Sequence, residues 1–181
     1  MKNKMEVQKT PIDGVLLIKP KVFGDVRGYF VETWQRNRYS EIGIDLPFVQ
    51  DNLSFSRKGT LRGLHYQDKH PQGKLVMVPY GEVFDVAVDI RKNSPTYGKW
   101  FGTILTQENQ FQLWIAPGLA HGFQVLSDSA LFSYKCTDFY HPEYERSIRW
   151  DDSELAISWP LNETPTSLSE KDRNALNFSQ L

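Results

Sequence analysis

Short runs of alternating apolar and polar residues recur along this chain, and such alternation is typical of half-buried β-strands. Gly, Pro, Asn and Asp separate the runs, as expected where strands end in turns. The pattern predicts strands at Gly14–Lys19, Gly28–Trp34, Phe48–Ser54, Gly59–Tyr66, Lys74–Pro79, Glu82–Ile90, Trp100–Leu105, Gln112–Ile115, Ala120–Leu126 and Leu131–Thr137. Helical spacing is rare and predicts short helices at Asn37–Ile42 and Ser169–Leu176. The second has Ser169 as N-cap and Asp172 three residues later, as in a capping box.

Many short strands and few helices predict an all-β fold: a β-sandwich, a jelly roll or a barrel. The chain has no internal repeat and no linker rich in Ser, Gly or Pro, and its 181 residues suit one domain. We therefore expect a single domain over residues 1–181. The polar segment Asp151–Leu181 contains Pro160 and Pro165, and we expect it to wrap around the surface of this domain and end in the short helix.

The composition limits the possible binding partners and the cellular compartment of the protein. With 24% charged residues and a net charge of -1, the chain lacks the positive charge that favours nucleic acid. Cys136 is the only cysteine, which excludes an intrachain disulfide, and its strand-like surroundings predict a small buried side chain. Residues Met1–Glu6 lack the apolar core of a signal peptide, and no apolar run is long enough for a membrane helix. We expect a soluble, cytoplasmic protein with neither a nucleic-acid nor a membrane partner.

The first candidate chemistry lies in Thr60–Gln67 and Gly73–Val78, which are predicted to form one β-hairpin that presents Arg62, His65 and Lys74. A base that titrates near neutrality, next to a fixed positive charge and a lysine, suits removal of a proton beside the carbonyl group of an anionic substrate. A solvated hairpin that happens to be polar accounts for the spacing equally well.

The second candidate is His121, which follows the turn at Pro117-Gly118 and either lines the mouth of a barrel or, more commonly, bonds to backbone. Together, His65 and His121 resemble the two histidine motifs of the cupin jelly rolls. Metal-binding cupins carry His-x-His and a following Glu in the first motif, but here Gln67 takes the second position and no matching Glu precedes Gly81. Two histidines and an amide do not make a three- or four-ligand site, so we expect a cupin barrel without a metal. The remaining histidines precede prolines in turn-like contexts and are expected at the surface: His70 and His141.

A third group suits the recognition of a nucleotide. Arg27, Phe30 and Glu32 follow a turn and offer a phosphate contact, a stacking ring and an acceptor for a base N–H. Gln50 and Asn52 alternate, which places both on one face of a strand. In isolation, an exposed polar hairpin explains these residues better.

A fourth group consists of Tyr134, Tyr140 and Glu145. A tyrosine that faces a base across a pocket can act as a general acid. More often, a strand tyrosine packs its ring and leaves its hydroxyl at the surface.

Blocks of these residues follow one order along nearly the whole chain: Phe23-Gly24-Asp25-x-Arg27-Gly28-x-Phe30, Phe48-Val49-Gln50-Asp51-Asn52, Leu61-Arg62-Gly63-Leu64-His65-Tyr66-Gln67, Lys74, residues 81–91, Pro117-x-x-x-His121-Gly122-Phe123, Tyr134 and Leu168-Ser169-x-Lys171-Asp172. In this order they resemble the dTDP-4-dehydrorhamnose 3,5-epimerases, dimeric cupins of nucleotide-sugar biosynthesis. The set is far more specific than any single motif. It implies a cupin-type jelly roll with a few short helices.

The resemblance also implies a role for each matching residue. His65 is similar to the family's general base, Asp172 to the carboxylate that orients it, and Lys74 to the group that stabilises an enolate oxygen. Tyr134 resembles the acid that returns a proton from the opposite face, and Tyr140 the ring that stacks on thymine. Nucleotide and phosphate contacts are implied for Arg27, Glu32, Gln50, Asn52, Arg62, His121, Glu145 and Lys171. The family places Arg27 and Phe30 near the partner subunit's site, which implies a homodimer.

The implied reaction converts dTDP-4-dehydro-6-deoxy-D-glucose to dTDP-4-dehydro-L-rhamnose by inversion at C3 and C5. The ketone makes the protons on both neighbouring carbons removable, an enolate forms, and protonation from the other face inverts the centre. No redox change takes place, so the resemblance implies neither a nicotinamide nor a metal cofactor.

Three alternatives stay open at this point. A metal-dependent cupin enzyme, such as a dioxygenase, conflicts with Gln67 and the missing Glu. A non-catalytic cupin that binds a sugar or nucleotide conflicts with the joint presence of a base, an acid, a lysine and a carboxylate. A relative that inverts only one carbon, or that acts on another nucleotide-linked keto sugar, would use the same base and acid, and the sequence does not separate it.

Overall fold

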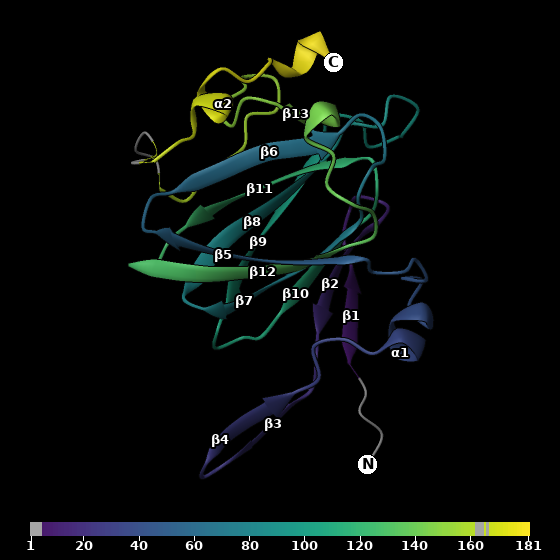
Figure 1. Ribbon diagram of the computed structural model, residues 1–181, viewed down its shortest axis with the longest axis vertical. Coiled ribbons are helices and arrows are strands. Elements are labelled where there is room, and N and C mark those ends of the chain that lie inside the picture. The colour runs from purple at the N-terminus through teal and green to yellow at the C-terminus, as the bar shows by residue number, and fades with distance from the viewer. Residues whose placement is uncertain (1–4, 162–164, 166) are drawn as a thin grey trace.

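The computed structural model describes residues 5–161, 165 and 167–181, and two antiparallel β-sheets form its body (Figure 1). In spatial order, the six-stranded sheet contains β1 (Glu6–Lys9), β2 (Val15–Lys19), β10 (Gln112–Ile115), β7 (Lys74–Tyr80), β12 (Ser129–Cys136) and β5 (Gln50–Arg57). The five-stranded sheet contains β13 (Glu145–Ser147), β6 (Leu61–Gln67), β11 (Leu119–Val125), β8 (Glu82–Asp89) and β9 (Trp100–Thr106). A third pair, β3 (Val22–Asp25) and β4 (Gly28–Val31), forms a hairpin that projects from the body. The all-β prediction is confirmed.

The main core lies between the two sheets, as strand alternation requires. Val76 and Val78 of β7 and Phe132 of β12 pack there with Val83 of β8 and Phe123 of β11. The outer face of the five-stranded sheet is covered as well, which explains why β8 and β11 are buried along nearly their whole length.

The described part of the C-terminal segment covers the outer face of the five-stranded sheet, in agreement with the prediction that this segment wraps around the domain surface. Trp159 and Phe178 pack there against Leu61, Leu64 and Val86. On the six-stranded sheet, Tyr39 of helix α1 (Arg36–Ser40) and Ile44 pack with Ile18, Leu75 and Trp114. The outer face of the six-stranded sheet is covered only in part, because Leu53 and Phe55 of its edge strand β5 are exposed.

Several predicted elements need correction. The strands β1, β3 and β13 were not expected; β1 and β3 are largely exposed and β13 is only three residues long, so none carries a strong apolar pattern. The strand expected at Gly28–Trp34 ends at Val31. Helix α2 covers only Glu170–Arg173 of the predicted Ser169–Leu176, because Leu176 instead forms a bridge with Ile148. Its Ser169 cap is confirmed, since the hydroxyl accepts a hydrogen bond from Asp172 N.

The predicted hairpin of β6 and β7 is wrong. These strands belong to different sheets, and the polar residues 68–73, which include Pro71, cross from one sheet to the other. Arg62 and His65 therefore lie on one wall of the barrel and Lys74 on the other, instead of side by side on one hairpin.

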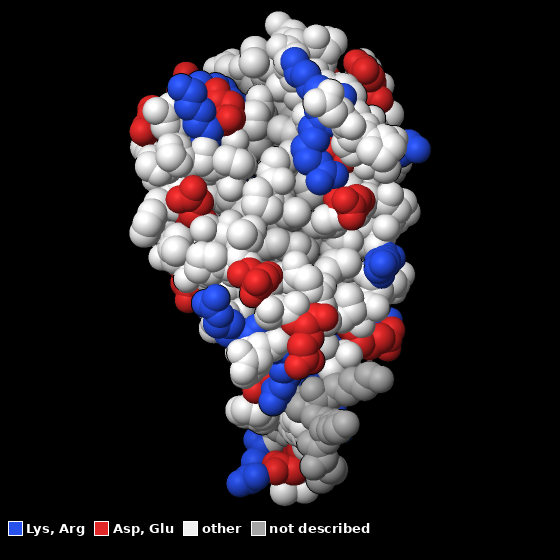
Figure 2. All heavy atoms as spheres, turned by 90° about the vertical axis from the view of Figure 1, so that its right-hand side faces the viewer, with Lys and Arg blue, Asp and Glu red and all other residues white. Residues whose placement is uncertain are grey.

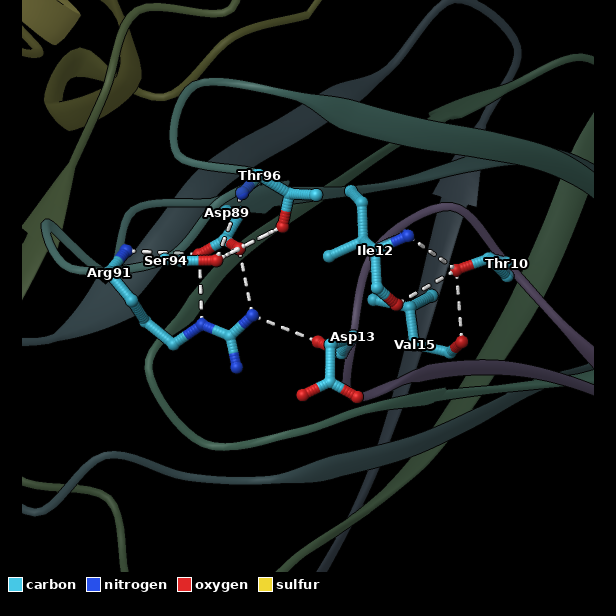
Figure 3. A network of polar contacts seen from close by, with 8 residues as sticks. All are labelled: Thr10, Ile12, Asp13, Val15, Asp89, Arg91, Ser94 and Thr96. Atoms are coloured by element: carbon cyan, nitrogen blue, oxygen red, sulfur yellow. Dashed lines mark hydrogen bonds and ion pairs between the residues drawn. The ribbon is translucent and has the colours of Figure 1, made fainter.

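At the end of β8, a polar network joins the loop that follows this strand to Asp13, which lies between β1 and β2 (Figure 3). The buried Asp89 carboxylate accepts hydrogen bonds from Arg91, Ser94 and Thr96, and Arg91 also donates to the carbonyl oxygen of Asp13. Burial raises the pKa of Asp89, but these donors outweigh it and hold the pKa well below its usual range. This network stabilises the loop between β8 and β9.

The molecular surface agrees with the balanced composition. On the face that Figure 2 shows, Lys and Arg side chains are interspersed with Asp and Glu. Within the described residues, no helix has the length and apolarity needed to cross a membrane. Cys136 is buried, as its strand-like surroundings predicted.

Candidate active site

A cavity of about 400 Å³ opens into the barrel between the two sheets. Side chains from both walls line it: Gln50, Asn52 and Ser54 of β5, Arg62, His65, Tyr66 and Gln67 of β6, Lys74 of β7, His121 and Phe123 of β11, Phe132 and Tyr134 of β12, together with Gln72, Tyr140, Glu145 and Lys171. Most of the polar residues singled out in the sequence therefore meet in one place.

An irregularity in β6 puts two of them on the same wall. In a regular strand, residues three apart point to opposite faces. Gly63 has φ +117°, and a Cβ there would lie 2.6 Å from Gly122 Cα, where the register between β6 and β11 also shifts. Arg62 and His65 consequently both line the cavity while Leu64 packs on the outside.

The first of two histidine–aspartate pairs joins His65 to the C-terminal helix α2. His65 Nε2 lies 2.6 Å from Asp172 Oδ1, and the Asp172 carboxyl is buried. Burial raises the pKa of Asp172, but hydrogen bonds from His65, Ser169 and the Gly63 amide outweigh it and the pKa falls below its usual value. An ionised carboxylate can only accept, so Nε2 of His65 is the donor in this pair, and Nδ1 is the ring nitrogen that a neutral imidazole would use to take a proton.

The second pair lies deeper and was not expected. His121 Nε2 lies 2.8 Å from Asp85 Oδ1, and both residues are buried. Burial lowers the pKa of His121, partly opposed by Asp85, so this imidazole is neutral. The other oxygen, Asp85 Oδ2, has no hydrogen-bond partner among the described residues. The sequence signal for this pair is Asp85 itself, a carboxylate on the inward face of the otherwise apolar run 83–88.

Lys74 and Tyr134 lie on the six-stranded wall, facing the two histidines on the five-stranded wall. Burial lowers the pKa of Lys74, opposed by Cys136, Glu145 and Asp85. Its ammonium has no hydrogen-bond or ion-pair partner within the described residues, so it is available to an oxygen atom in the cavity. Burial raises the pKa of the Tyr134 hydroxyl, which therefore keeps its proton at neutral pH.

At the rim, hydrogen bonds order a second group of predicted residues. Gln50 Nε2 donates to Asn52 Oδ1 at 3.0 Å, which confirms that both lie on one face of β5. The Tyr140 hydroxyl donates to Glu145 at 2.6 Å, and this bond raises the pKa of Tyr140 to about 12. Lys171 forms an ion pair with the other Glu145 oxygen at 2.6 Å. Arg62, Lys74 and Lys171 give this cavity three cationic side chains, which suits an anionic ligand.

Asp172 reaches this cavity only through His65, and three further predicted residues do not join it within one chain. Arg27 and Phe30 lie on the projecting β3–β4 hairpin, where Arg27 pairs with Asp25 and the Phe30 ring is 66% exposed. Glu32, just after the hairpin, forms an ion pair with Arg38. None of the three lines the cavity.

Outside the cavity, His70, Asp138 and His141 bring possible metal-ligand atoms within 4.8 Å of one another. His70 is exposed and His141 half-buried, close to the surface positions expected for both. The two imidazole rings stack, with centroids 4.6 Å apart and an angle of 28° between their planes. Since a metal lies in the plane of each imidazole that binds it, nearly parallel stacked rings do not converge on one ion. As they stand, these residues do not form a metal site.

Comparison with known proteins assigns the cavity to a family. The model of the family described as dTDP-4-dehydrorhamnose 3,5-epimerase matches residues 9–180. This chain belongs to the dTDP-4-dehydrorhamnose 3,5-epimerase family. Its double-sheet barrel is accordingly a cupin-type jelly roll, as the sequence resemblance implied.

Individual members of the dTDP-4-dehydrorhamnose 3,5-epimerase family are similar over almost their whole length. A dTDP-4-dehydrorhamnose 3,5-epimerase of Pseudomonas aeruginosa is 53% identical over 176 residues, which cover 97% of each protein. A crystal structure of the dTDP-6-deoxy-D-glucose-3,5-epimerase of Legionella pneumophila in complex with dTDP-4-keto-L-rhamnose is 56% identical, with a TM-score of 0.95, and the match covers 98% of this chain and 95% of that one. A dTDP-4-dehydrorhamnose 3-epimerase of Streptomyces niveus is 41% identical over 97% of this chain and 85% of that protein.

Proposed function

We propose that this chain inverts C3 and C5 of dTDP-4-dehydro-6-deoxy-D-glucose to give dTDP-4-dehydro-L-rhamnose, a step of dTDP-L-rhamnose biosynthesis. One observation carries the proposal: a histidine oriented by a buried carboxylate lies on one wall of the cavity, and a protonated tyrosine lies on the opposite wall. Inversion of a carbon needs a base on one side of the sugar ring and an acid on the other.

In the proposed reaction, the free Nδ1 of His65 removes the proton from C5 or C3, and the electron pair moves to the C4 oxygen as an enolate. Lys74 stabilises this oxygen, which costs little reorganisation because its ammonium is already desolvated and unpaired. Tyr134 then delivers its hydroxyl proton to the opposite face of the carbon. Asp172 acts through His65: it fixes the ring and stabilises the imidazolium that forms. Solvent returns a proton to Tyr134 and takes one from His65, so the cycle closes without redox change.

The remaining predicted residues are proposed to hold the nucleotide. Arg62 and Lys171 suit the diphosphate, and Gln50 and Asn52 offer amide groups to the base and sugar. Tyr140 is proposed to stack on thymine, with Glu145 holding its hydroxyl. His121 is proposed to contact the ligand from the floor of the cavity.

A homodimer is proposed to complete the cavity. The β3–β4 hairpin projects away from the barrel and exposes Arg27, Phe30 and Tyr29, while the edge strand β5 exposes Leu53 and Phe55. Unpaired edges and exposed aromatic side chains of this kind are commonly covered by a second copy. In such a dimer, Arg27, Phe30 and Glu32 would line the cavity of the partner subunit.

We also propose that the protein is cytoplasmic. Its single cysteine is buried and forms no intrachain disulfide, so the fold does not depend on an oxidising compartment.

The test is incubation with dTDP-4-dehydro-6-deoxy-D-glucose in deuterated water, followed by NMR of the sugar. We expect deuterium at both C3 and C5 and formation of the L-rhamno product. Absence of label at both carbons, in protein that binds dTDP, would overturn the proposed activity.

A second candidate is inversion of C3 alone. It is favoured by the similarity to the 3-epimerase of Streptomyces niveus, since one base and one acid suffice for either outcome. Label confined to C3 would select it.

A further inference from the structure

The ring of Tyr140 is held in place mainly by hydrogen bonds rather than by packing. Its side chain is 48% exposed at the rim of the cavity, so packing does little to fix the ring. Three sets of hydrogen bonds fix it instead. Gln50 Oε1 accepts from the Tyr140 amide at 3.0 Å, Glu145 accepts from its hydroxyl, and Gln67 binds both of its neighbours in the chain.

Gln67 makes the most extensive of these contacts. Its Nε2 donates to the carbonyl oxygens of His70 at 2.6 Å and Phe139 at 3.3 Å, and its Oε1 accepts from the His141 amide at 2.7 Å. The side chain is only 7% exposed, so each of these groups would be costly to leave unpaired. One buried amide thus ties the crossing after β6 to the peptide groups on both sides of Tyr140.

We propose that Gln67 is a positioning residue that sets the orientation of Tyr140 toward the ligand. The inference rests on the proposed function, in which Tyr140 receives the nucleotide base. Gln67 stands two residues after His65, where a metal-binding cupin carries its second histidine. Gln67 likewise lies at the cavity wall, but its side-chain amide binds backbone groups of the rim instead of a metal ion.

The matched control is Gln124 of β11. It is a buried amide that binds the backbone of one distant residue, donating to the carbonyl oxygen of Leu161 at 3.2 Å and accepting from its N–H at 3.0 Å. Unlike Gln67, it does not line the cavity. Gln67→Met removes three side-chain hydrogen bonds and Gln124→Met removes two, in each case with a side chain of similar shape. Both variants should lose thermal stability, and only Gln67→Met should affect the ligand.

The first readout needs no ligand. Hydrogen exchange of the His141 amide should become faster in Gln67→Met and stay unchanged in Gln124→Met. The second readout is calorimetric binding of dTDP, for which we expect a Kd about tenfold higher in Gln67→Met, because the Gln50 and Glu145 contacts still hold the ring partly. The kcat at saturating substrate should change less than about threefold, since His65 and Tyr134 are untouched.

A double-mutant cycle decides whether the effect passes through Tyr140. In a Tyr140→Ala background, Gln67→Met should weaken dTDP binding no further. Full additivity, or an unchanged Kd in the single variant, would overturn the positioning role. If the wild-type chain fails to bind dTDP, the proposed function fails, and the exchange measurement still judges whether Gln67 orders the rim.

A charge variant sharpens the test. In Gln67→Glu, the introduced carboxylate faces two carbonyl oxygens at neutral pH, whereas its protonated form regains one donor. The Kd for dTDP should therefore improve toward the wild-type value as the pH is lowered to about 5, and it should not do so in Gln67→Met. A Kd equally insensitive to pH in both variants would contradict the assigned contacts.

Discussion

The two histidine–aspartate pairs of the cavity form the same kind of hydrogen bond but differ in their exposure to solvent. His65 and His121 lie opposite each other on neighbouring strands, and each uses Nε2 to bind a carboxylate. The carboxylate of the first pair comes from the short helix α2, and His65 remains 24% exposed to the cavity. The second carboxylate comes from the barrel wall, and both partners are buried.

This difference suits the first pair to the proposed proton transfer and the second pair to electrostatic support. A base must meet the substrate and exchange protons with solvent, and His65 has that access. Asp85 and His121 have little access, so their pair is suited to hold fixed charge and geometry near Lys74. Having the same residue types at hydrogen-bond distance therefore does not establish the same role, and exposure decides between them.

Replacement of His65 should give the largest effect. His65→Asn removes the base, so deuterium exchange at both C3 and C5 should fall by about 10³–10⁴-fold. In the proposed complex other residues hold the dTDP moiety, so the Kd for dTDP should change little. The matched variant His121→Asn should weaken binding but keep exchange measurable at saturating substrate. Retained turnover in His65→Asn would end the assignment of the base.

Tyr134→Phe separates acid from base. The ring still packs, but the phenolic proton is lost, so formation of inverted product should fall by about 10²–10³-fold. Exchange of label should fall much less, because His65 still removes the proton and can return a solvent deuteron to the same face. Both rates can be measured by NMR on one preparation. An equal fall of both would remove Tyr134 from the catalytic residues.

Asp172→Asn tests the first pair and should cost about 10²-fold in kcat, because an amide can donate to His65 and hold the wrong tautomer. The pKa of Asp172 is lowered in the fold, so its ionised form stabilises the native state above the unfolded pKa. This contribution is lost as the pH falls through the folded pKa. Below about pH 4, the free energy of unfolding of the wild type should therefore fall more steeply than that of the variant. Parallel curves from urea titrations would contradict this linkage.

The sequence predicted the residues of the site better than their arrangement. Alternation in β5 correctly placed Gln50 with Asn52 on one face, whereas Tyr134 was singled out by the family resemblance and its place at the inner wall comes from the structure. The separation of β6 and β7 into different sheets could not be predicted, since a polar stretch with a proline suits a hairpin turn and a crossing between sheets equally. Local pattern fixes which face a residue occupies, whereas sheet membership depends on contacts distant in sequence.

Asp85 and Gln67 were missed as functional residues for a related reason. Asp85 lies between Val83 and Ala87 on the inward face of β8, and Gln67 stands at the end of β6, where only its fitness as a metal ligand was considered. Their partners, His121 and the residues beside Tyr140, are 36 and more than 70 positions away. Asp172 was found only through family resemblance, because the spacing of Ser169 and Asp172 explains it equally well as part of a helix cap. The structure shows that it does both.

Asp85→Asn should give the smallest effect and tests the second pair. The change keeps an acceptor for His121 but removes a negative charge that opposes the desolvation of Lys74, whose other charged or titratable neighbours are Cys136, Glu145 and Lys171. The pKa of Lys74 is already lowered, so its ammonium form is lost as the pH rises through that value, and in the variant this loss should begin at lower pH. The kcat at neutral pH should fall less than about tenfold, while the alkaline limb of the pH profile of kcat moves toward neutral pH.

The matched control for this last prediction is Asp89→Asn, on the same strand, with an equally buried carboxylate that serves only the loop network of Figure 3. Asp89→Asn should lower the melting temperature, because three donors lose a charged acceptor, yet leave the alkaline limb where the wild type has it. If the limb moves equally in both variants, the shift reflects general loosening of β8. If it moves in neither, Asp85 does not support the charge of Lys74, and the second pair serves only to hold His121.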